Sequence, residues 1–215
     1  MKLFALFVIA ASCYAQVAAE ANSNYKTPEG RAKLAITLLA HDRDQQQKPT
    51  ELVQSMKLTP GMTVADIGTG AGYMIPFLKD AVGAPGKIIA EDIFPDFLEK
   101  AKARVKEKNV EGVTFIQGND KDPGLPEAAI DAALVLDVYH HFDYPERMLA
   151  GIARGLKPGG RLVIVDFYKA GFRDPKHIRL DEADVIKEIQ ANGFELISNA
   201  PHTPNRQYIA IFRKK

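Results

Sequence analysis

The chain has 215 residues, with 28 Lys and Arg against 27 Asp and Glu, which gives a formal net charge of +1 at pH 7. This length fits one ordinary globular domain plus an extension, and it is enough to bury a full core. The balanced charge, with no basic run, argues against a large nucleic-acid footprint, because such a footprint needs a basic face. We therefore expect no nucleic-acid partner.

The first residues have the pattern of a targeting segment. Lys2 precedes an apolar run at positions 3–11, and small residues follow up to Ala21. This pattern predicts a secretory signal peptide over residues 1–21, and hence export to the periplasm or the medium. The run is short for a bilayer span, which needs about 20 residues. A retained membrane anchor with the domain in the cytoplasm is the alternative, and membrane contact is expected only through this segment.

Cys13, the only cysteine, lies inside that segment. Lipid attachment there is disfavoured, because Ala10 stands where a leucine is usual. Removal of the segment leaves no thiol, which excludes cysteine nucleophiles, thiolate metal sites and thiol-based arsenic methylation. No metal site is expected.

The rest of the chain alternates between apolar patterns typical of helices and apolar runs typical of buried strands. Residues 22–47 predict a helical extension, and residues 48–56 predict a helix with Thr50 as its N-cap. Pro60-Gly61 turns the chain into a strand that ends at Ile67. Further strands are expected over 86–90, 113–116, 131–136 and 161–165, and helices over 74–82, 95–108, 145–156 and 181–192.

The strands lack polar alternation and are separated by helices, which predicts a parallel sheet covered on both faces. The last two strands, 194–198 and 207–212, are joined by about eight residues. A parallel crossover needs a dozen or more, so this pair must be antiparallel. The predicted fold class is α/β, a doubly wound, mostly parallel seven-stranded sheet with one antiparallel strand near the C-terminus.

A glycine-rich turn follows the first strand. Gly68, Gly70 and Gly72 alternate after Asp66, and glycines at such a turn leave backbone N–H groups open to a carboxylate-bearing or anionic ligand. A dinucleotide fingerprint requires a small residue at the position of Tyr73, so that fingerprint fails.

The pattern D-x-G-x-G-x-G resembles the cofactor loop of class I S-adenosyl-L-methionine (SAM)-dependent methyltransferases. The resemblance spans residues 48–215 and includes Glu91-Asp92, Asp137-Val-Tyr-His-His and Lys157-Pro-Gly-Gly. Within the family the chain looks like uncharacterised bacterial small-molecule-type enzymes, with weaker similarity to quinone-ring methylating enzymes. The resemblance implies a Rossmann-like methyltransferase domain over 48–215 and SAM as the cofactor.

The resemblance also assigns roles at the strand ends. Asp92, with Glu91 as the alternative, would accept hydrogen bonds from the ribose hydroxyls. Asp120 or Asn119 would accept a hydrogen bond from the adenine amino group, and Asp120 is favoured because a carboxylate only accepts. The remaining cofactor-loop and strand-end candidates are Asp66, Gly68, Gly70, Gly72 and Asp137.

Tyr139, His140 and His141 resemble the family segment beside the methyl group. If the acceptor is a hydroxyl, His140 or His141 is the natural base. An amine or an activated carbon needs none. Asn/Asp-Pro-Pro-Tyr/Phe, typical of amine-methylating enzymes, is absent. The segments 166–169 and 177–179 are candidate walls of the acceptor pocket.

The expected function is methyl transfer from SAM to an unidentified small molecule. Two alternatives stay open. A non-catalytic SAM- or nucleoside-binding protein would share the cofactor residues but would not need Tyr139, His140 or His141. An NAD-dependent oxidoreductase is weakened by Tyr73.

Overall fold

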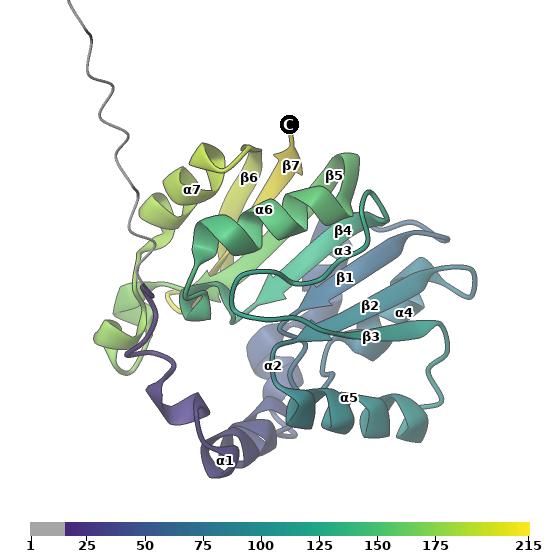
Figure 1. The fold of residues 1–215 in the computed structure, drawn as a ribbon, viewed down its shortest axis with the longest axis horizontal. Coiled ribbons are helices and arrows are strands. Elements are labelled where there is room, and N and C mark those ends of the chain that lie inside the picture. The colour runs from purple at the N-terminus through teal and green to yellow at the C-terminus, as the bar shows by residue number, and fades with distance from the viewer. Residues whose placement is uncertain (1–15) are drawn as a thin grey trace, which may run out of the picture.

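The computed structural model describes residues 16–215, in which one seven-stranded sheet lies between two layers of helices (Figure 1). The strand order is β3-β2-β1-β4-β5-β7-β6. The strands are β1 (Thr63–Ile67), β2 (Lys87–Asp92), β3 (Val113–Gln117), β4 (Ile130–Leu136), β5 (Leu156–Phe167), β6 (Phe194–Thr203) and β7 (Gln207–Lys214). The predicted doubly wound sheet is confirmed.

Only β7 runs against its neighbours, because it pairs antiparallel with both β5 and β6, whereas β1 to β5 pair in parallel. The predicted reversed strand is therefore confirmed. Its connection is shorter than the predicted eight residues: β6 continues to Thr203 through two register shifts, so only residues 204–206 join the pair. Bulges let a strand continue past a local misfit in pairing.

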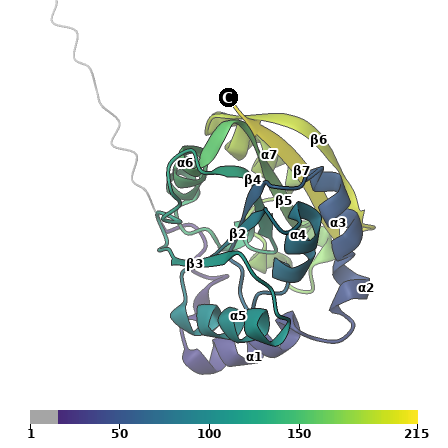
Figure 2. The ribbon, with the colours of Figure 1, turned by 90° about the vertical axis from the view of Figure 1, so that its right-hand side faces the viewer.

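Two apolar clusters fill the spaces between the sheet and its helices. One face of the sheet is covered by α3 (Pro49–Met56), α4 (Ile75–Val82) and α5 (Pro95–Glu107). The other face is covered by α6 (Pro145–Gly155) and α7 (Glu182–Ala191). Figure 2 shows α6 on one side of the sheet and α3 and α4 on the other. Burial on both faces explains why the strands are continuously apolar.

Prolines mark the first residue of several helices. Pro49, Pro95 and Pro145 are each the first residue of a helix, where the missing N–H costs nothing. The predicted N-cap at Thr50 is wrong, because α3 already begins at Pro49 and its cap position is Lys48, which has φ 43°. β5 starts earlier than predicted, at Leu156. Its pairing with β4 begins where Leu156 pairs with Ile130 and is then interrupted by an irregularity at residues 157–160.

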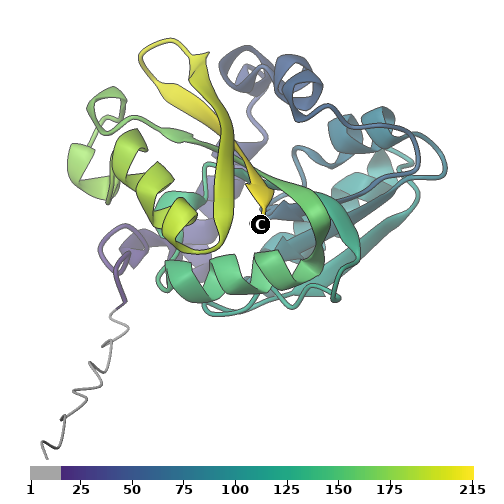
Figure 3. The same ribbon diagram turned by 90° about the horizontal axis from the view of Figure 1, so that it is seen from above.

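The N-terminal extension covers the edge where the parallel strands end. It contains one 3-10 turn, η1 (Ser23–Tyr25), and two α-helices, α1 (Pro28–Leu38) and the short α2 (Arg43–Gln47). Figure 2 shows α1 along α5, to which Arg31 ties it by donating to Asp96 over 2.8 Å. The β6–β7 hairpin reaches α2 (Figure 3), where the His202 ring lies 2.7 Å from the Gln47 carbonyl.

Residues 16–21 also pack onto the domain. The Val17 N–H donates to the Asp143 carbonyl over 3.0 Å, and Ala18 and Ala21 are buried. The expected signal boundary at residue 21 therefore falls within a packed segment. The rest of that prediction, residues 1–15, lies outside the described residues. Within residues 16–215, no helix has the length and apolarity needed to cross a bilayer.

Candidate functional site

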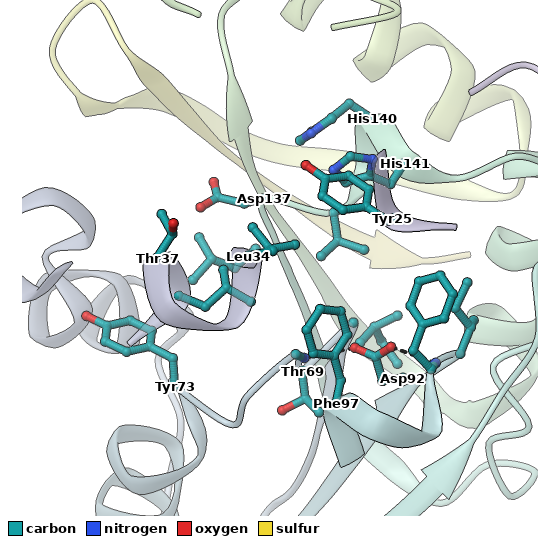
Figure 4. Close-up of a pocket in the computed structure, with 18 of the residues that line it drawn as sticks. Tyr25, Leu34, Thr37, Thr69, Tyr73, Asp92, Phe97, Asp137, His140 and His141 are labelled. Atoms are coloured by element: carbon teal, nitrogen blue, oxygen red, sulfur yellow. Dashed lines mark hydrogen bonds between the residues drawn. The ribbon is translucent and has the colours of Figure 1, made fainter. Parts of the chain in front are cut away.

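A cavity of about 780 Å³ opens above the carboxyl ends of β1, β2 and β4 and beneath the N-terminal extension. In Figure 4, Asp92 and Thr69 lie at one end, and His140, His141 and Tyr25 lie at the other. Most of the residues predicted for the site line this cavity: Asp66, Gly68, Gly70, Glu91, Asp92, Asn119, Asp120, Asp137, His140 and His141. Gly72 and Tyr139 do not.

The glycine loop forms the floor below Asp92. Gly68 and Gly70 have φ of 68° and 54°, values that favour glycine. The Gly70 N–H donates to Asp92 Oδ2 over 2.9 Å, and the Gly68 N–H donates to Glu91 Oε2 over 3.3 Å. A Cβ on Gly68 would meet the Val138 side chain at 2.6 Å. The loop therefore depends on glycine for both conformation and space.

Gly72 packs against α5 and does not line the cavity. A Cβ at this position would lie 3.0 Å from the Ala101 Cβ on α5. The third glycine therefore lets the loop approach α5. All three glycines were predicted to face the ligand, but only Gly68 and Gly70 line the cavity.

Asp92 and Glu91 sit at the end of β2 with exposed fractions of 5% and 1%. Burial raises the pKa of Asp92 to about 6. Burial, and next the negative charge of Asp92, raise the pKa of Glu91 well above its usual range. Asp92 Oδ1 also accepts from the Phe94 N–H over 2.9 Å, which fixes the carboxylate at the cavity wall. Two oxygens with spare lone pairs suit a ribose diol.

The loop after β3 contains Asn119 and Asp120, the two predicted acceptors for the adenine amino group, and they differ in their hydrogen bonds. Asn119 Oδ1 accepts from the backbone N–H groups of Lys121 and Asp122, at 2.9 and 3.0 Å, so it is occupied by its own turn. Within residues 16–215 the carboxylate of Asp120 makes no hydrogen bond, and it lines the cavity. The geometry favours Asp120 as the acceptor for an amino group.

Asp66 lies at the base of the loop. The Thr69 hydroxyl donates to Asp66 Oδ2 over 2.7 Å, and burial raises the pKa of Asp66 to about 6. Thr69 lines the cavity and was missed by the sequence analysis. Its position between two glycines of the pattern could have signalled it.

Asp137 connects the sheet to the extension. It adopts φ 58°, which Asp tolerates better than most residues, and Oδ2 accepts from the Gln47 side chain over 2.7 Å. Gln207 donates to its other oxygen, and Arg43 Nη2 lies 3.5 Å away. Burial raises the pKa of Asp137 to about 6. The residue orders the cavity wall as well as lining it.

Arg43 also lines the cavity, although the sequence pattern did not predict it. Its guanidinium lies over the Tyr73 ring at 4.7 Å, and its buried Nε has no hydrogen-bond partner in the described part of the chain. Buried polar atoms without a partner are uncommon, so this donor suits a ligand carboxylate. No local signal places an arginine of the extension over this cavity.

His140 and His141 form the far end of the cavity. His140, with 5% exposure, places Nδ1 2.7 Å from Asp166 Oδ1. His141 places Nδ1 2.8 Å from the Asn22 side-chain oxygen. Burial, and then the nearby His140 and His177, lower the pKa of His141 well below its usual value. His141 is therefore neutral at pH 7.

Tyr139 lies on the opposite side of this turn. It is fully buried in the core beneath α6 and α7, and its hydroxyl donates to Glu188 Oε1 over 2.7 Å. The prediction that Tyr139 faces the reacting group is therefore wrong: in a three-residue helical turn (η2, Tyr139–His141) neighbouring side chains point in different directions.

The two segments predicted to form the walls of the acceptor pocket, 166–169 and 177–179, line the cavity only in part. Phe167 and His177 line the cavity, and Phe172 stacks on His177 with ring centroids 5.0 Å apart. Arg179 instead pairs with Glu188.

The chain resembles known proteins in sequence and in fold. Residues 65–164 match a family described as "Methyltransferase domain". An arsenite methyltransferase from Halobacterium salinarum is 27% identical over 165 residues, which cover 71% of this chain and 42% of that protein. A ubiquinone/menaquinone biosynthesis C-methyltransferase from Ectopseudomonas mendocina is 31% identical over 113 residues, which cover 52% and 44%. The chain thus spans about half the length of the curated relatives it matches.

Among solved structures, a SAM-dependent methyltransferase from Aquifex aeolicus superposes with a TM-score of 0.80. The alignment covers 88% of this chain and 99% of that one, at 23% identity. This likeness shows the shared fold.

Proposed function

We propose that this chain, which belongs to the class I SAM-dependent methyltransferases, transfers a methyl group from SAM to a small-molecule acceptor. The observation that carries the proposal is one cavity with two unlike ends. The end at Asp92 and the glycine loop is polar, and the end at His140 and His141 is bordered by aromatic rings.

The polar end fits the cofactor of this family. Asp92 would accept from the ribose hydroxyls and Asp120 from the adenine amino group. Arg43, with its unpartnered Nε, and the N–H groups of the glycine loop would hold the carboxylate of the methionine part. Asp66 and Asp137 offer negative charge to its amino group. The cavity of about 780 Å³ is within the usual size range of ligand pockets.

When bound, SAM would supply a methyl group on a sulfonium, which an electron pair of the acceptor would take up while the carbon–sulfur electron pair stays on sulfur. The main task of the chain is to hold the acceptor in line with that methyl group, which can lower the barrier by several kcal/mol. The extension contributes by covering the cavity with Tyr25, Leu34, Thr37 and Leu38, which keeps water out.

A hydroxyl acceptor would also need to lose its proton. His141 is neutral and its Nδ1 faces an amide oxygen, so Nε2 carries the lone pair that can take the proton. An amine or carbon acceptor would need no such base. The proposal holds for either kind of acceptor.

The aromatic end suits a flat, ring-containing acceptor. Tyr25 meets His141 edge-on at 4.8 Å, and Phe167 meets Phe172 edge-on at 4.8 Å. The relative that is named as a ubiquinone/menaquinone biosynthesis C-methyltransferase supports a ring-containing acceptor. Arsenite is not proposed, because the chain's only cysteine, Cys13, is in the segment that we expect to be removed.

The test is calorimetric titration of the full chain with SAM, using Asp92→Asn as the variant and Asp80→Asn, an exposed carboxylate on α4, as the control. We expect micromolar binding by the wild type and the control and at least a tenfold loss in Asp92→Asn. Binding of NAD in preference to SAM would favour the oxidoreductase alternative. SAM binding without methyl transfer to any ring-containing acceptor in a screen would favour the non-catalytic alternative.

Export is a separate proposal. It rests on the signal-like sequence, and the packing of residues 16–21 on Asp143 favours a cleavage site before Gln16 over one after Ala21. N-terminal sequencing of the protein recovered outside the cytoplasm tests both points.

A further inference from the structure

Three histidines gather at the aromatic end of the cavity. His140 and His141 come from η2, and His177 ends the turn η4 (Pro175–His177). One ligand nitrogen from each lies within 4.8 Å of the other two. The ring centroids are 4.0 Å apart for His140 and His141, and 5.2 Å apart for each of them with His177. Figure 4 shows His140 and His141 beside Tyr25 at this end.

The ring of His140 is held by a buried carboxylate. Asp166 accepts from the His140 backbone N–H at 3.0 Å and from the Phe167 N–H at 2.8 Å, so it cannot turn away. Its Oδ1 lies 2.7 Å from His140 Nδ1. An ionised carboxylate only accepts, so Nδ1 carries the hydrogen and Nε2 carries the lone pair. Metal-binding histidines commonly donate their second N–H to a carboxylate in this way.

The ring of His141 is held similarly by Asn22. The Asn22 amide nitrogen donates to the His141 carbonyl over 3.0 Å, which fixes which end of the amide is oxygen. That oxygen lies 2.8 Å from His141 Nδ1, so Nδ1 donates and Nε2 again carries the lone pair. The extension thus supplies the partner that orients the second histidine.

The ring of His177 is oriented by stacking. It lies parallel to the Phe172 ring, 5.0 Å away at 10°, and neither ring nitrogen makes a hydrogen bond to residues 16–215. His177 is partly exposed and belongs to a loop, so of the three rings it has the most freedom to move.

We propose that His140, His141 and His177 bind one divalent transition-metal ion of the Zn²⁺ class, with a coordination position left open to the cavity. Three imidazoles with an open position form a recurring zinc site, and imidazole nitrogens also suit Co²⁺, Ni²⁺ and Cu²⁺. Tetrahedral bonds of about 2.0–2.1 Å bring ligand nitrogens to about 3.3 Å from one another. The ligand nitrogens, which lie within 4.8 Å of one another, would therefore have to approach by up to about 1.5 Å, and the His177 ring has the most freedom to do so.

The position of the site gives the ion a role. The open position faces the space assigned to the acceptor, so the ion would coordinate an acceptor oxygen and lower its pKa, and the proton would pass to bulk water as the acceptor enters the cavity. This role rests on the proposed methyl transfer, whereas ion binding does not. It would make a hydroxyl or enol acceptor reactive without a histidine base, since all three rings would be ligands.

The test is titration of the chelator-treated full chain with Co²⁺, followed by visible absorption, and with Zn²⁺, followed by calorimetry. We expect one ion per chain and the intense d–d bands of four- or five-coordinate Co²⁺. His177→Ala should weaken binding at least about a hundredfold, and Asp166→Asn, which leaves all ligands in place, about 10–100-fold. His41→Ala changes an exposed histidine on the extension and should change nothing.

Absence of stoichiometric binding by the wild type would overturn the site, as would binding that His177→Ala leaves unchanged. Because His177→Ala could alter the loop, His141→Gln provides a second ligand variant, and thermal melts confirm that each variant is folded. SAM titration of the same samples separates the two proposals. SAM binding without ion binding refutes only the metal site, and ion binding without SAM binding refutes only the methyltransferase function.

Discussion

The side-chain amide of Gln47 donates to the Asp137 carboxylate over 2.7 Å and thereby joins the end of α2 to the end of β4. Gln47 also accepts from Gln207 Nε2 at 3.1 Å. Gln47 and Gln207 are buried, and Asp137 is partly buried, at the boundary between the sheet and the extension that covers the cavity. The fit of the extension on the sheet therefore depends on a small polar network.

Replacement of Gln47 by Ala should destabilise the protein by roughly 1–3 kcal/mol, because Asp137 Oδ2 loses its Gln47 donor and Gln207 Nε2 loses its Gln47 acceptor, which leaves the contact between Gln207 and Asp137 as the remainder of the network. Urea unfolding, monitored by circular dichroism, measures this. Gln45→Ala removes an exposed glutamine from the same helix and should change stability by less than about 0.5 kcal/mol. Equal losses in the two variants would show that the network does not fix the extension.

The sequence sufficed for the parts of the fold that depend on local pattern. The apolar strands, the proline-started helices and the reversed last strand all follow from chain-local signals, and so do Asp66, Gly68 and Asp92 at the strand ends. The position of the extension does not, since nothing in residues 16–47 specifies which edge of the sheet they cover. Arg43 therefore went unrecognised as a cavity residue.

The sequence also could not predict in which direction each side chain of a short turn points. Tyr139, His140 and His141 are consecutive, and only the packing of Glu188 and Asp166 on opposite sides decides which side chain faces the cavity. The role of Gly72 was missed for a similar reason, because the approach of Ala101 to the loop is a tertiary contact.

Replacement of Tyr139 by Phe should cost about 1 kcal/mol of stability, the usual net value of one hydrogen bond, because Glu188 loses its Tyr139 donor but keeps Arg179. The affinity for SAM should be unchanged, since Tyr139 lies outside the cavity. Thermal melts and calorimetry measure the two quantities. A loss of SAM affinity without a loss of stability would restore Tyr139 to the site.

The buried carboxylates predict an unusual dependence of stability on pH. The pKa of Asp92 is raised from 3.8 to about 6 in the folded protein, so folding favours its protonated form. The resulting stabilisation is fully present below the unfolded pKa and is lost as pH rises through about 6. Each unit of pKa is worth about 1.4 kcal/mol, so the contribution is on the order of 3 kcal/mol.

The difference between Asp92→Asn and the wild type isolates this contribution from other titrating groups. The stability of the variant relative to the wild type should fall by about 1–2 kcal/mol when the pH is lowered from 7.5 to 5, because only the wild type gains a proton at this position. Denaturant unfolding at both pH values measures it. A relative stability that does not change with pH would show that Asp92 is already ionised at pH 5.

Binding of SAM should depend on pH in the opposite direction. The ionised Asp92 carboxylate accepts two ribose hydrogen bonds, whereas the protonated form loses acceptor capacity. With a pKa of about 6, some nine in ten molecules carry a proton on Asp92 at pH 5, so protonation of Asp92 alone should raise the apparent Kd about tenfold from pH 7.5 to pH 5. Calorimetry at several pH values measures this rise, and Asp80→Asn should follow the wild type. In Asp92→Asn the affinity should be weak, and its remaining dependence on pH should reflect only Asp66 and Asp137, whose pKa values burial also raises to about 6. A wild-type Kd that stays constant down to pH 5 would move the ribose contact from Asp92 to another group.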